Sequence, residues 1–395
     1  MNKLYFLMFF SLPLVFLTLE SNFVFGDILV LIIFSINLFN VNLVITKFDI
    51  RYLFLTLLFI SSNLIALMFS NYDISNSVFK LMQMLFIFYI LYPVIKKFVN
   101  KVGNLELILK ALILACNFSI IYAILIGSKQ LELVSTIHGR YFSFFGNPWI
   151  FSFFIMMCIP YTNYFFLSSK SKVIKFFYLI SILLQVYGLL LSGSRTGIIC
   201  LMIFVFIYIY IYIFKNFNFQ IKILSIVLVG VLIIYITFNY TFLIEILVRL
   251  VTPSFPNLGI KLSTLMQDDI DTTRSSLFSM ASAYLKGSPI IGLGLGNFYN
   301  YSGLVSMHSY FLSFWVEGGF FALFSILLLH VYAIKIIFSK RKILGDDLFR
   351  MLIISNILFL VFTSFNPVLM HRFYWLVLLI SLSIENLDED MSVCN

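Results

Sequence analysis

Three basic side chains are the strongest candidates for chemistry in this sequence: Arg195, Arg274 and His308. Arg195 follows Ser194 in the turn-forming segment Ser192–Gly197, which leads directly into a long apolar run. Free backbone N–H groups at the start of a helix and a guanidinium group both bind phosphate oxygens. The segment therefore predicts an anion site at Arg195 and Ser194, and an arginine with a purely structural role is the alternative interpretation.

Arg274 is predicted to lie on a helix that begins at Asp271 and ends at Lys286. With the helical period, it shares one face with three apolar residues, Phe278, Ala281 and Leu285. A cation on an apolar face requires an anionic partner, and either the nearby Asp268–Asp269 pair or a ligand phosphate meets that requirement. Substrate binding and a structural ion pair therefore both stay open for Arg274.

His308 precedes Ser309 and Tyr310 at the start of an apolar run. Histidine is the side chain best suited to accept a proton near neutral pH, although a structural histidine is the alternative. Glu317 follows nine residues later, which on a straight helix is about 13 Å further along and on the opposite side. The two cannot form a dyad unless Gly318–Gly319 breaks the helix, and Glu317 is predicted to pair with a basic group.

Three further polar or charged residues lie in other turn-forming motifs of the sequence. Arg140 and Asn147 precede Pro148 in a second turn before an apolar run, where they either line a site or are structural. Asn297 closes the segment Gly292–Asn297, whose GxGxG spacing lacks the strand–turn–helix context of a dinucleotide site and predicts a flexible loop. The four histidines show no HxxxH or HExxH spacing, so no metal centre or other cofactor is predicted.

The elements that position these residues follow from the composition. Of the 395 residues, 62% are hydrophobic and only 11% are charged, with a mean hydropathy of +1.05. A soluble domain has about a quarter of its residues charged, so this class is excluded. Apolar runs of about 17–25 residues cross a membrane as helices. The runs predict an all-α, polytopic membrane protein with about twelve transmembrane helices, at 4–19, 28–45, 50–69, 78–95, 107–126, 149–167, 173–191, 197–214, 221–240, 309–334, 349–366 and 371–385.

The 26 lysine and arginine residues orient these helices. Most of them lie in alternate connections, and cytoplasmic loops are the ones enriched in basic residues. Both termini are therefore predicted to be cytoplasmic, and the net charge of +9 reflects topology rather than nucleic acid binding.

The same orientation makes residues 241–308 a long external segment between the ninth and tenth helices. It separates a region of nine helices, 1–240, from a region of three helices and a short cytoplasmic tail, 309–395. Within the segment, Glu245 and Arg249 have the spacing of a helical ion pair and predict a short interfacial helix.

Several short motifs, taken in order, resemble those of bacterial O-antigen polymerases and their relatives, the O-antigen ligases. They cover roughly residues 138–325 and are Phe144–Pro148, Ser192–Gly197, Arg274, Gly292–Phe298, His308–Leu312 and Glu317–Gly319. The usual His-Asn pair of the family is His308–Ser309 in this chain.

This resemblance implies a glycosyltransferase that uses neither a metal nor a nucleotide sugar. Its donor would be a glycan on undecaprenyl pyrophosphate, held at the periplasmic face of the bacterial inner membrane. Arg195 and Arg274 would hold the pyrophosphate and stabilise its growing charge, and His308 would accept a proton from the acceptor hydroxyl. The expected substrate-binding residues are Arg140, Asn147, Ser194, Asn297 and Glu317.

The acceptor separates the two branches of the family. A polymerase joins one lipid-linked repeat unit to another, whereas a ligase transfers the glycan to lipid A-core. The contexts of Gly146–Pro148 and Ser192–Arg195 resemble the polymerase branch and favour it. A flippase for lipid-linked sugars is a further alternative, but it would line a central cavity with charges from many helices. The expected partners are the bilayer, the lipid-linked oligosaccharide and a chain-length regulator protein.

Overall fold

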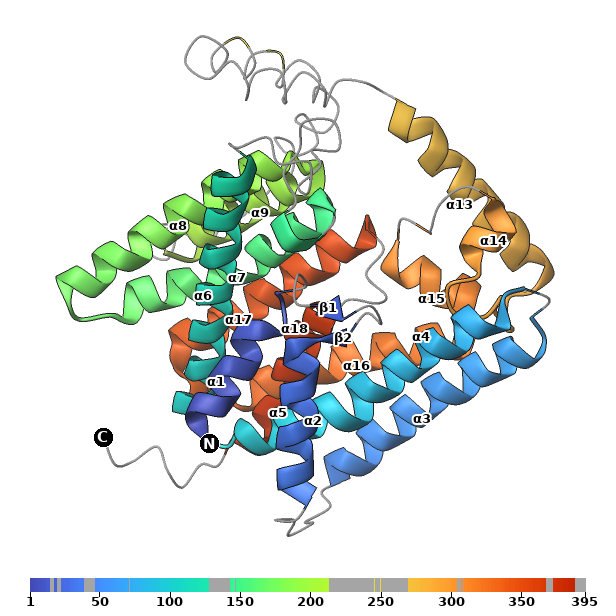
Figure 1. The fold of residues 1–395 in the computed structure, drawn as a ribbon, viewed down its shortest axis with the longest axis horizontal. Coiled ribbons are helices and arrows are strands. Elements are labelled where there is room, and N and C mark those ends of the chain that lie inside the picture. The colour runs from blue at the N-terminus through green and yellow to red at the C-terminus, as the bar shows by residue number, and fades with distance from the viewer. Residues whose placement is uncertain are drawn as a thin grey trace, which may run out of the picture.

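A computed structural model describes most of the chain (Figure 1). The described residues are 1–14, 18–19, 23–38, 47–70, 72–127, 143–145, 147–212, 245, 249, 269–303, 307, 309–366 and 372–387. They are helical almost throughout, as the composition predicts. The exception among them is a short antiparallel pair of strands, β1 (Thr18–Leu19) and β2 (Phe23–Val24).

The helices follow one another along the chain in the order labelled in Figure 1. They are α1 (Asn2–Ser11), α2 (Phe25–Leu38), α3 (Lys47–Met68), α4 (Ile74–Phe86), η2 (Ile87–Leu91), α5 (Tyr92–Phe98), α6 (Val102–Gly127), η3 (Ser143–Phe145), α7 (Pro148–Ser168), α8 (Lys172–Ser192), α9 (Arg195–Tyr212), α13 (Asp269–Gly287), α14 (Phe298–Ser302), α15 (Tyr310–Gly318), α16 (Phe320–Ser339), α17 (Arg341–Ser364), α18 (Arg372–Ser383) and η6 (Ile384–Asn386). Helix α13 matches the predicted range 271–286 within two residues.

Seven of the described helices are long and apolar enough to cross a membrane. They cover Phe48–Met68, Ile74–Phe98, Val102–Leu125, Pro148–Ser168, Lys172–Ser192, Phe320–Ser339 and Arg341–Ser364. Helices α2 and α9 are shorter apolar helices that overlap the predicted spans 28–45 and 197–214, and α18 has 12 residues. The predicted span 221–240 lies outside the described residues. The structure therefore confirms a polytopic helical protein, but it does not confirm the count of twelve spans.

The prediction of a single crossing helix over 4–19 is wrong. Helix α1 ends at Ser11 and Thr18–Leu19 forms β1. Pro13 follows closely, and proline has no N–H to donate to the preceding turn of a helix. A helix of 10 residues is about 15 Å long, about half the hydrocarbon thickness of a bilayer.

The predicted continuous span over 309–334 is also wrong, because two helices occupy it. The chain breaks at Gly319, whose φ of +84° suits glycine, and α16 begins at Phe320. Helix α15 runs back beside α16, because the Tyr310 hydroxyl lies 3.4 Å from Nε2 of His330, halfway along α16. The crossing segment is therefore α16 alone, and α15 leads into it.

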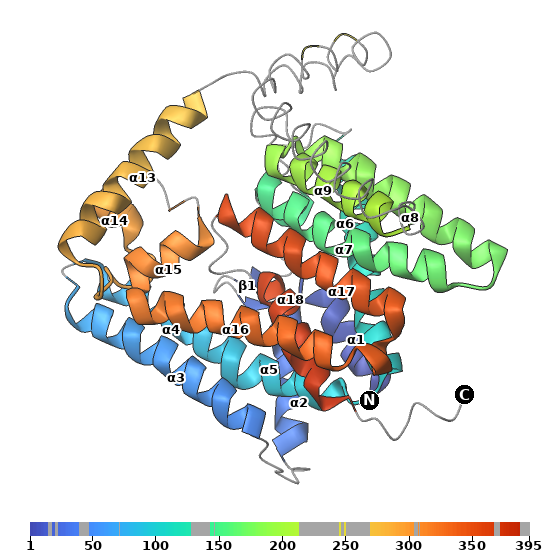
Figure 2. The ribbon, with the colours of Figure 1, turned by 180° about the vertical axis from the view of Figure 1, so that it is seen from behind.

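The helices form two groups in both views (Figures 1 and 2). Helices α3, α4 and α16 lie together, and α7, α8, α9 and α17 lie together. Rings of α18 connect the groups: Trp375 packs edge-on against Phe88 of η2, which continues α4, at 5.2 Å, and Tyr374 packs against Phe153 of α7 at 4.0 Å. Helix α13 lies outside both groups, beside α14 and α15.

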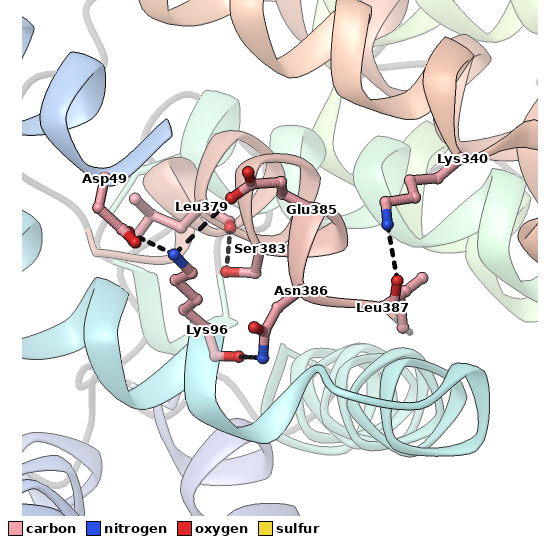
Figure 3. A network of polar contacts seen from close by, with 8 residues as sticks. All are labelled: Asp49, Lys96, Lys340, Leu379, Ser383, Glu385, Asn386 and Leu387. Atoms are coloured by element: carbon pink, nitrogen blue, oxygen red, sulfur yellow. Dashed lines mark hydrogen bonds and ion pairs between the residues drawn. The ribbon is translucent and has the colours of Figure 1, made fainter. Parts of the chain in front are cut away.

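At one end of the molecule, four chain segments are joined by polar contacts (Figure 3). The Lys96 ammonium at the end of α5 forms an ion pair with Asp49 of α3 and lies 3.7 Å from Glu385 of η6. The Asn386 side chain donates to the Lys96 carbonyl at 3.0 Å, and the Lys340 ammonium donates to the Leu387 carbonyl at 2.7 Å. All four segments are helix ends that the charge pattern assigns to the cytoplasmic side.

Candidate functional site

The carboxylate of Glu317, near the end of α15, organises the opposite end of the molecule. It is 2% exposed and accepts hydrogen bonds from the backbone N–H groups of Gly296, at 2.8 Å, and Phe298, at 3.3 Å. Burial raises its pKa, while the positive charge of Lys80 and the two N–H donors lower it. The basic group that we predicted for Glu317 is thus a nearby electrostatic partner, but the hydrogen bonds go to backbone amides.

These amides belong to the glycine-rich loop, which we define as residues 291–297. A Cβ atom at Gly292 would collide with the backbone carbonyl of Glu317, and Gly296 has a φ of +78° with the Lys80 side chain packed against it. Only glycine permits this conformation and this close approach. The glycines therefore let the loop fit tightly around the end of α15.

Hydrogen bonds to membrane-crossing helices hold the glycine-rich loop in place. The Ser70 hydroxyl donates to the Leu293 carbonyl at 2.7 Å, and the Ser77 hydroxyl donates to the Leu295 carbonyl at 2.9 Å. The buried Asn297 side chain donates to the Leu293 carbonyl, at 3.1 Å, and to the Ser70 hydroxyl, at 3.2 Å. The prediction of a flexible loop is therefore wrong, because Ser70, in the turn after α3, and Ser77, in the first turn of α4, satisfy carbonyl groups of the loop.

A small apolar core, here called the outer core, joins this loop to α13. Its buried residues are Leu277, Ala281, Leu293, Phe298, Met307 and Val316. The predicted apolar face of α13 is correct at Ala281 but wrong at Phe278, which is 45% exposed. The packed face is centred nearer to Leu277. Position 274 lies seven residues before Ala281 and so on the same side of α13, although the Arg274 side chain lies outside the described residues.

His308 itself lies outside the described residues, but both of its neighbours are placed. Met307 is buried in the outer core, and Ser309 precedes the first turn of α15. The Ser313 hydroxyl donates to the Ser309 carbonyl at 2.7 Å and reaches the Met307 carbonyl at 3.5 Å. The chain is therefore anchored on each side of position 308.

A second set of predicted residues meets at the start of α7 and α9. The Asn147 side chain accepts from the Trp149 N–H at 3.1 Å and caps α7, as expected for a residue before Pro148. The Ser194 hydroxyl accepts from the Gly197 N–H at 3.2 Å and caps α9, whose first residue is Arg195. Gly197 packs against Ser152 of α7. The two helix starts are therefore neighbours. Arg140 lies outside the described residues.

Ring contacts connect the two sets. Tyr310, at the start of α15, packs against Phe359 of α17 at 5.8 Å, and Phe359 packs against Phe153 of α7 at 5.8 Å. Phe153 lies two turns into the helix that Asn147 caps. The starts of α15 and α7 therefore border one aromatic core.

One functional candidate was missed at the level of sequence: the fully buried Asp27 near the start of α2. Its carboxylate pairs with Nε of Arg372 at 2.7 Å, where α18 begins. The adjacent Phe373 packs edge-on against Phe145 at 5.3 Å, in the turn before α7. A lone carboxylate in an apolar run was the available signal, because such a charge is costly without a partner. Arg372 is thus an internal ion-pair partner rather than an interface anchor.

Within the part of the chain that the structure describes, no group of three His, Cys, Asp or Glu side chains is arranged to hold a metal ion.

We expect the Glu317 contacts to stabilise the outer core. Glu317→Gln replaces one acceptor oxygen by an NH2 group, so that two donors face each other. This loss of a buried hydrogen bond should lower the free energy of unfolding by about 1–3 kcal/mol. Glu245→Gln is the matched control, because Glu245 is half exposed and pairs with Arg249 on the surface at 2.8 Å, a kind of pair that contributes about 0–1 kcal/mol. Thermal unfolding in detergent measures both. Equal midpoints for the two variants would contradict this assignment.

The effect of Glu317→Gln on the free energy of unfolding should also depend on pH. Because burial raises the pKa of Glu317 above its usual value of 4.5, the folded protein holds this proton more tightly than the unfolded chain. The stability contributed at this residue is therefore present at acid pH and falls as the pH rises through the pKa of the folded state. Glu317→Gln lacks this titration, so the difference in stability between the two proteins should narrow with rising pH.

Comparison with known proteins gives one match. Residues 180–329 match a family model described as O-antigen ligase. This segment begins within α8 and ends within α16, and it contains Arg195, Arg274, His308, the glycine-rich loop and Glu317. The match supports the resemblance to O-antigen ligases and polymerases that the ordered motifs indicate. No curated protein matches the chain.

Proposed function

We propose that this membrane protein is an O-antigen polymerase, a metal-independent glycosyltransferase that joins undecaprenyl-pyrophosphate-linked repeat units at the periplasmic face of the inner membrane. One observation carries the proposal. The segment that matches the O-antigen ligase family holds all three basic candidates, and it includes a hydrogen-bonded loop and helix start close to the position of His308.

Bond changes in the proposed reaction involve only donor and acceptor. The acceptor hydroxyl oxygen forms a bond to the anomeric carbon of the donor sugar, and the bond from that carbon to the pyrophosphate oxygen breaks. The pyrophosphate leaves with the electron pair, and the hydroxyl proton passes to His308. The lipid-linked pyrophosphate is the leaving group, so no other co-reactant is needed.

The charge that grows on the leaving pyrophosphate is assigned to Arg195 and Arg274. Ser194 caps α9 through its hydroxyl, so Arg195 stands at a helix N-terminus, where backbone N–H groups and the helix dipole favour an anion. A guanidinium adds paired donors that match phosphate oxygens. Two such cations would supply the charge stabilisation that a metal ion supplies in other transferases.

Substrate-binding roles for Asn147, Asn297 and Glu317 are proposed in a narrower form. Asn147 and Asn297 already bond to the backbone of their own turn or loop, and Glu317 already accepts from the backbone of the glycine-rich loop. We therefore assign them, together with Ser194, whose hydroxyl accepts from the Gly197 N–H, to shaping the turns that surround the glycan, while Arg140 keeps the proposed contact with substrate. A chain-length regulator protein is the proposed protein partner.

An O-antigen ligase is the second candidate, favoured by the description of the matching family model. A ligase would use the same donor and the same three basic residues but would take lipid A-core as acceptor. The contexts of Gly146–Pro148 and Ser192–Arg195 favour the polymerase.

Deletion of the gene, followed by electrophoresis of the surface glycan, tests the proposal. A polymerase deletion should leave single repeat units on lipid A-core. Polymer retained on the undecaprenyl carrier would identify a ligase instead. Lipid-linked units that accumulate on the cytoplasmic face would identify a flippase and overturn the proposed transferase.

A further inference from the structure

Helix α16 exposes one row of large apolar side chains along its length. The row contains Phe320, Phe321, Phe324, Leu327, Val331 and Phe338, each between 41% and 59% exposed. These residues recur with helical spacing on a helix that is long and apolar enough to cross a membrane. The row is therefore the side of α16 that faces lipid.

Ile290 extends this row beyond the end of the helix. Its carbonyl accepts the backbone N–H of Phe320 at 3.1 Å, so it lies directly beside the first residue of α16, and its side chain is 58% exposed. The Gly319 backbone approaches Ile290 so closely that no side chain would fit there. Ile290 is thus fixed at the end of the lipid-facing row although it belongs to the segment after α13.

Trp315 gives the same segment the character of a membrane interface. Its indole N–H donates to the Pro289 carbonyl at 2.8 Å, one residue before Ile290. Tryptophan is enriched at membrane interfaces, where its ring is apolar and its N–H is hydrogen-bonded. Lys286, four residues before Ile290, is exposed and adds a positive charge at the level of lipid headgroups.

The length of α16 places Phe320 and Ile290 relative to the hydrocarbon boundary of the bilayer. Its 20 residues are about 30 Å long, which matches the hydrocarbon thickness of a bilayer. Lys340 and Arg341 end it on the side opposite to Phe320. With the basic end at one surface, Phe320 lies at the other hydrocarbon boundary, and Ile290 beside it.

We propose that Ile290 inserts into the outer leaflet and anchors the segment of α13, the glycine-rich loop and α15 at the depth of the lipid headgroups. The occupant of this surface is lipid: acyl chains on Ile290 and the α16 row, and headgroups on Lys286. The anchor does not depend on the proposed reaction. Its consequence for that reaction is that position 308 is held near the level where the pyrophosphate of a lipid-linked donor lies.

The test uses the full-length chain in lipid nanodiscs, with an environment-sensitive fluorophore on Ile290→Cys. Cys394→Ser removes the cysteine outside the described residues, and Cys116, Cys158 and Cys200 are buried. Phe324→Cys, one turn into α16, is the lipid control, and Ser282→Cys on the exposed side of α13 is the water control. A lipid with a nitroxide near its headgroup serves as the quencher.

We expect the label at position 290 to resemble the one at 324. Its emission should shift to shorter wavelength than at position 282, and the nitroxide lipid should reduce it about twofold or more. An emission equal to that at 282 would overturn the proposal. A short-wavelength emission that the nitroxide lipid leaves unquenched would also overturn it, because protein rather than lipid would then cover Ile290. Gel filtration of each variant establishes that it is folded.

Discussion

Arg195→Ala should reduce polymer synthesis by about 100-fold or more, as expected when a preorganised donor to a developing anion is removed. Arg195 begins α9, and Ser194 already caps that helix, so the substitution leaves the helix start intact. The loss should therefore appear in turnover rather than in the amount of folded protein. Glycan length and yield in a complemented deletion strain measure it, together with turnover of the purified enzyme on a lipid-linked donor.

Two comparisons make this result specific. Arg195→Lys keeps the charge but loses the paired donors of the guanidinium, so it should restore only part of the activity. Arg341→Ala is the matched control, because Arg341 is 55% exposed and pairs with Asp346 at the other end of the molecule. It should leave polymer yield unchanged. Normal polymer length and yield in both Arg195→Ala and Arg274→Ala would exclude a pyrophosphate site at these residues.

His308→Ala is expected to lower the turnover number by about 100-fold to 10,000-fold, the range found for a removed general base. Because the base acts in the transition state, the KM for the lipid-linked donor should change little. Rates measured against pH provide the decisive readout. The wild type should lose activity as the pH falls below the pKa of histidine, about 6.5, and the variant should lack this acid limb.

A control is needed for the packing around position 308. Met307 and Ser309 are anchored by the outer core and by Ser313, so replacement of His308 alone should leave thermal unfolding unchanged. Ser313→Ala removes the hydroxyl that bonds to the Ser309 carbonyl and keeps His308. It should reduce turnover less than His308→Ala and retain the acid limb. A normal rate in His308→Ala would remove the proposed base.

Most of the helices were predictable because membrane helices are local structures. A span needs a run of apolar residues, and a helix end needs a cap or a breaker, so both can be recognised from neighbouring residues. Helix α13 and the Glu245–Arg249 ion pair agree with the prediction for this reason. Helix α15 was harder to predict. Gly318–Gly319 is a possible break, but the apolar run continues through it, and the contact of Tyr310 with His330 shows that the chain reverses there.

The roles of the polar side chains divide in the same way. The sequence alone determined the membrane class, the helical elements, the likeness to O-antigen polymerases and ligases, and the basic residues worth testing, because composition, period and motif order are properties of adjacent residues. The tertiary structure alone decided that Glu317 binds the glycine-rich loop and that Asp27 pairs with Arg372. Asp27 and Arg372 lie near opposite ends of the chain. A buried charge needs a partner, but only the packing of the helices shows which residue that partner is.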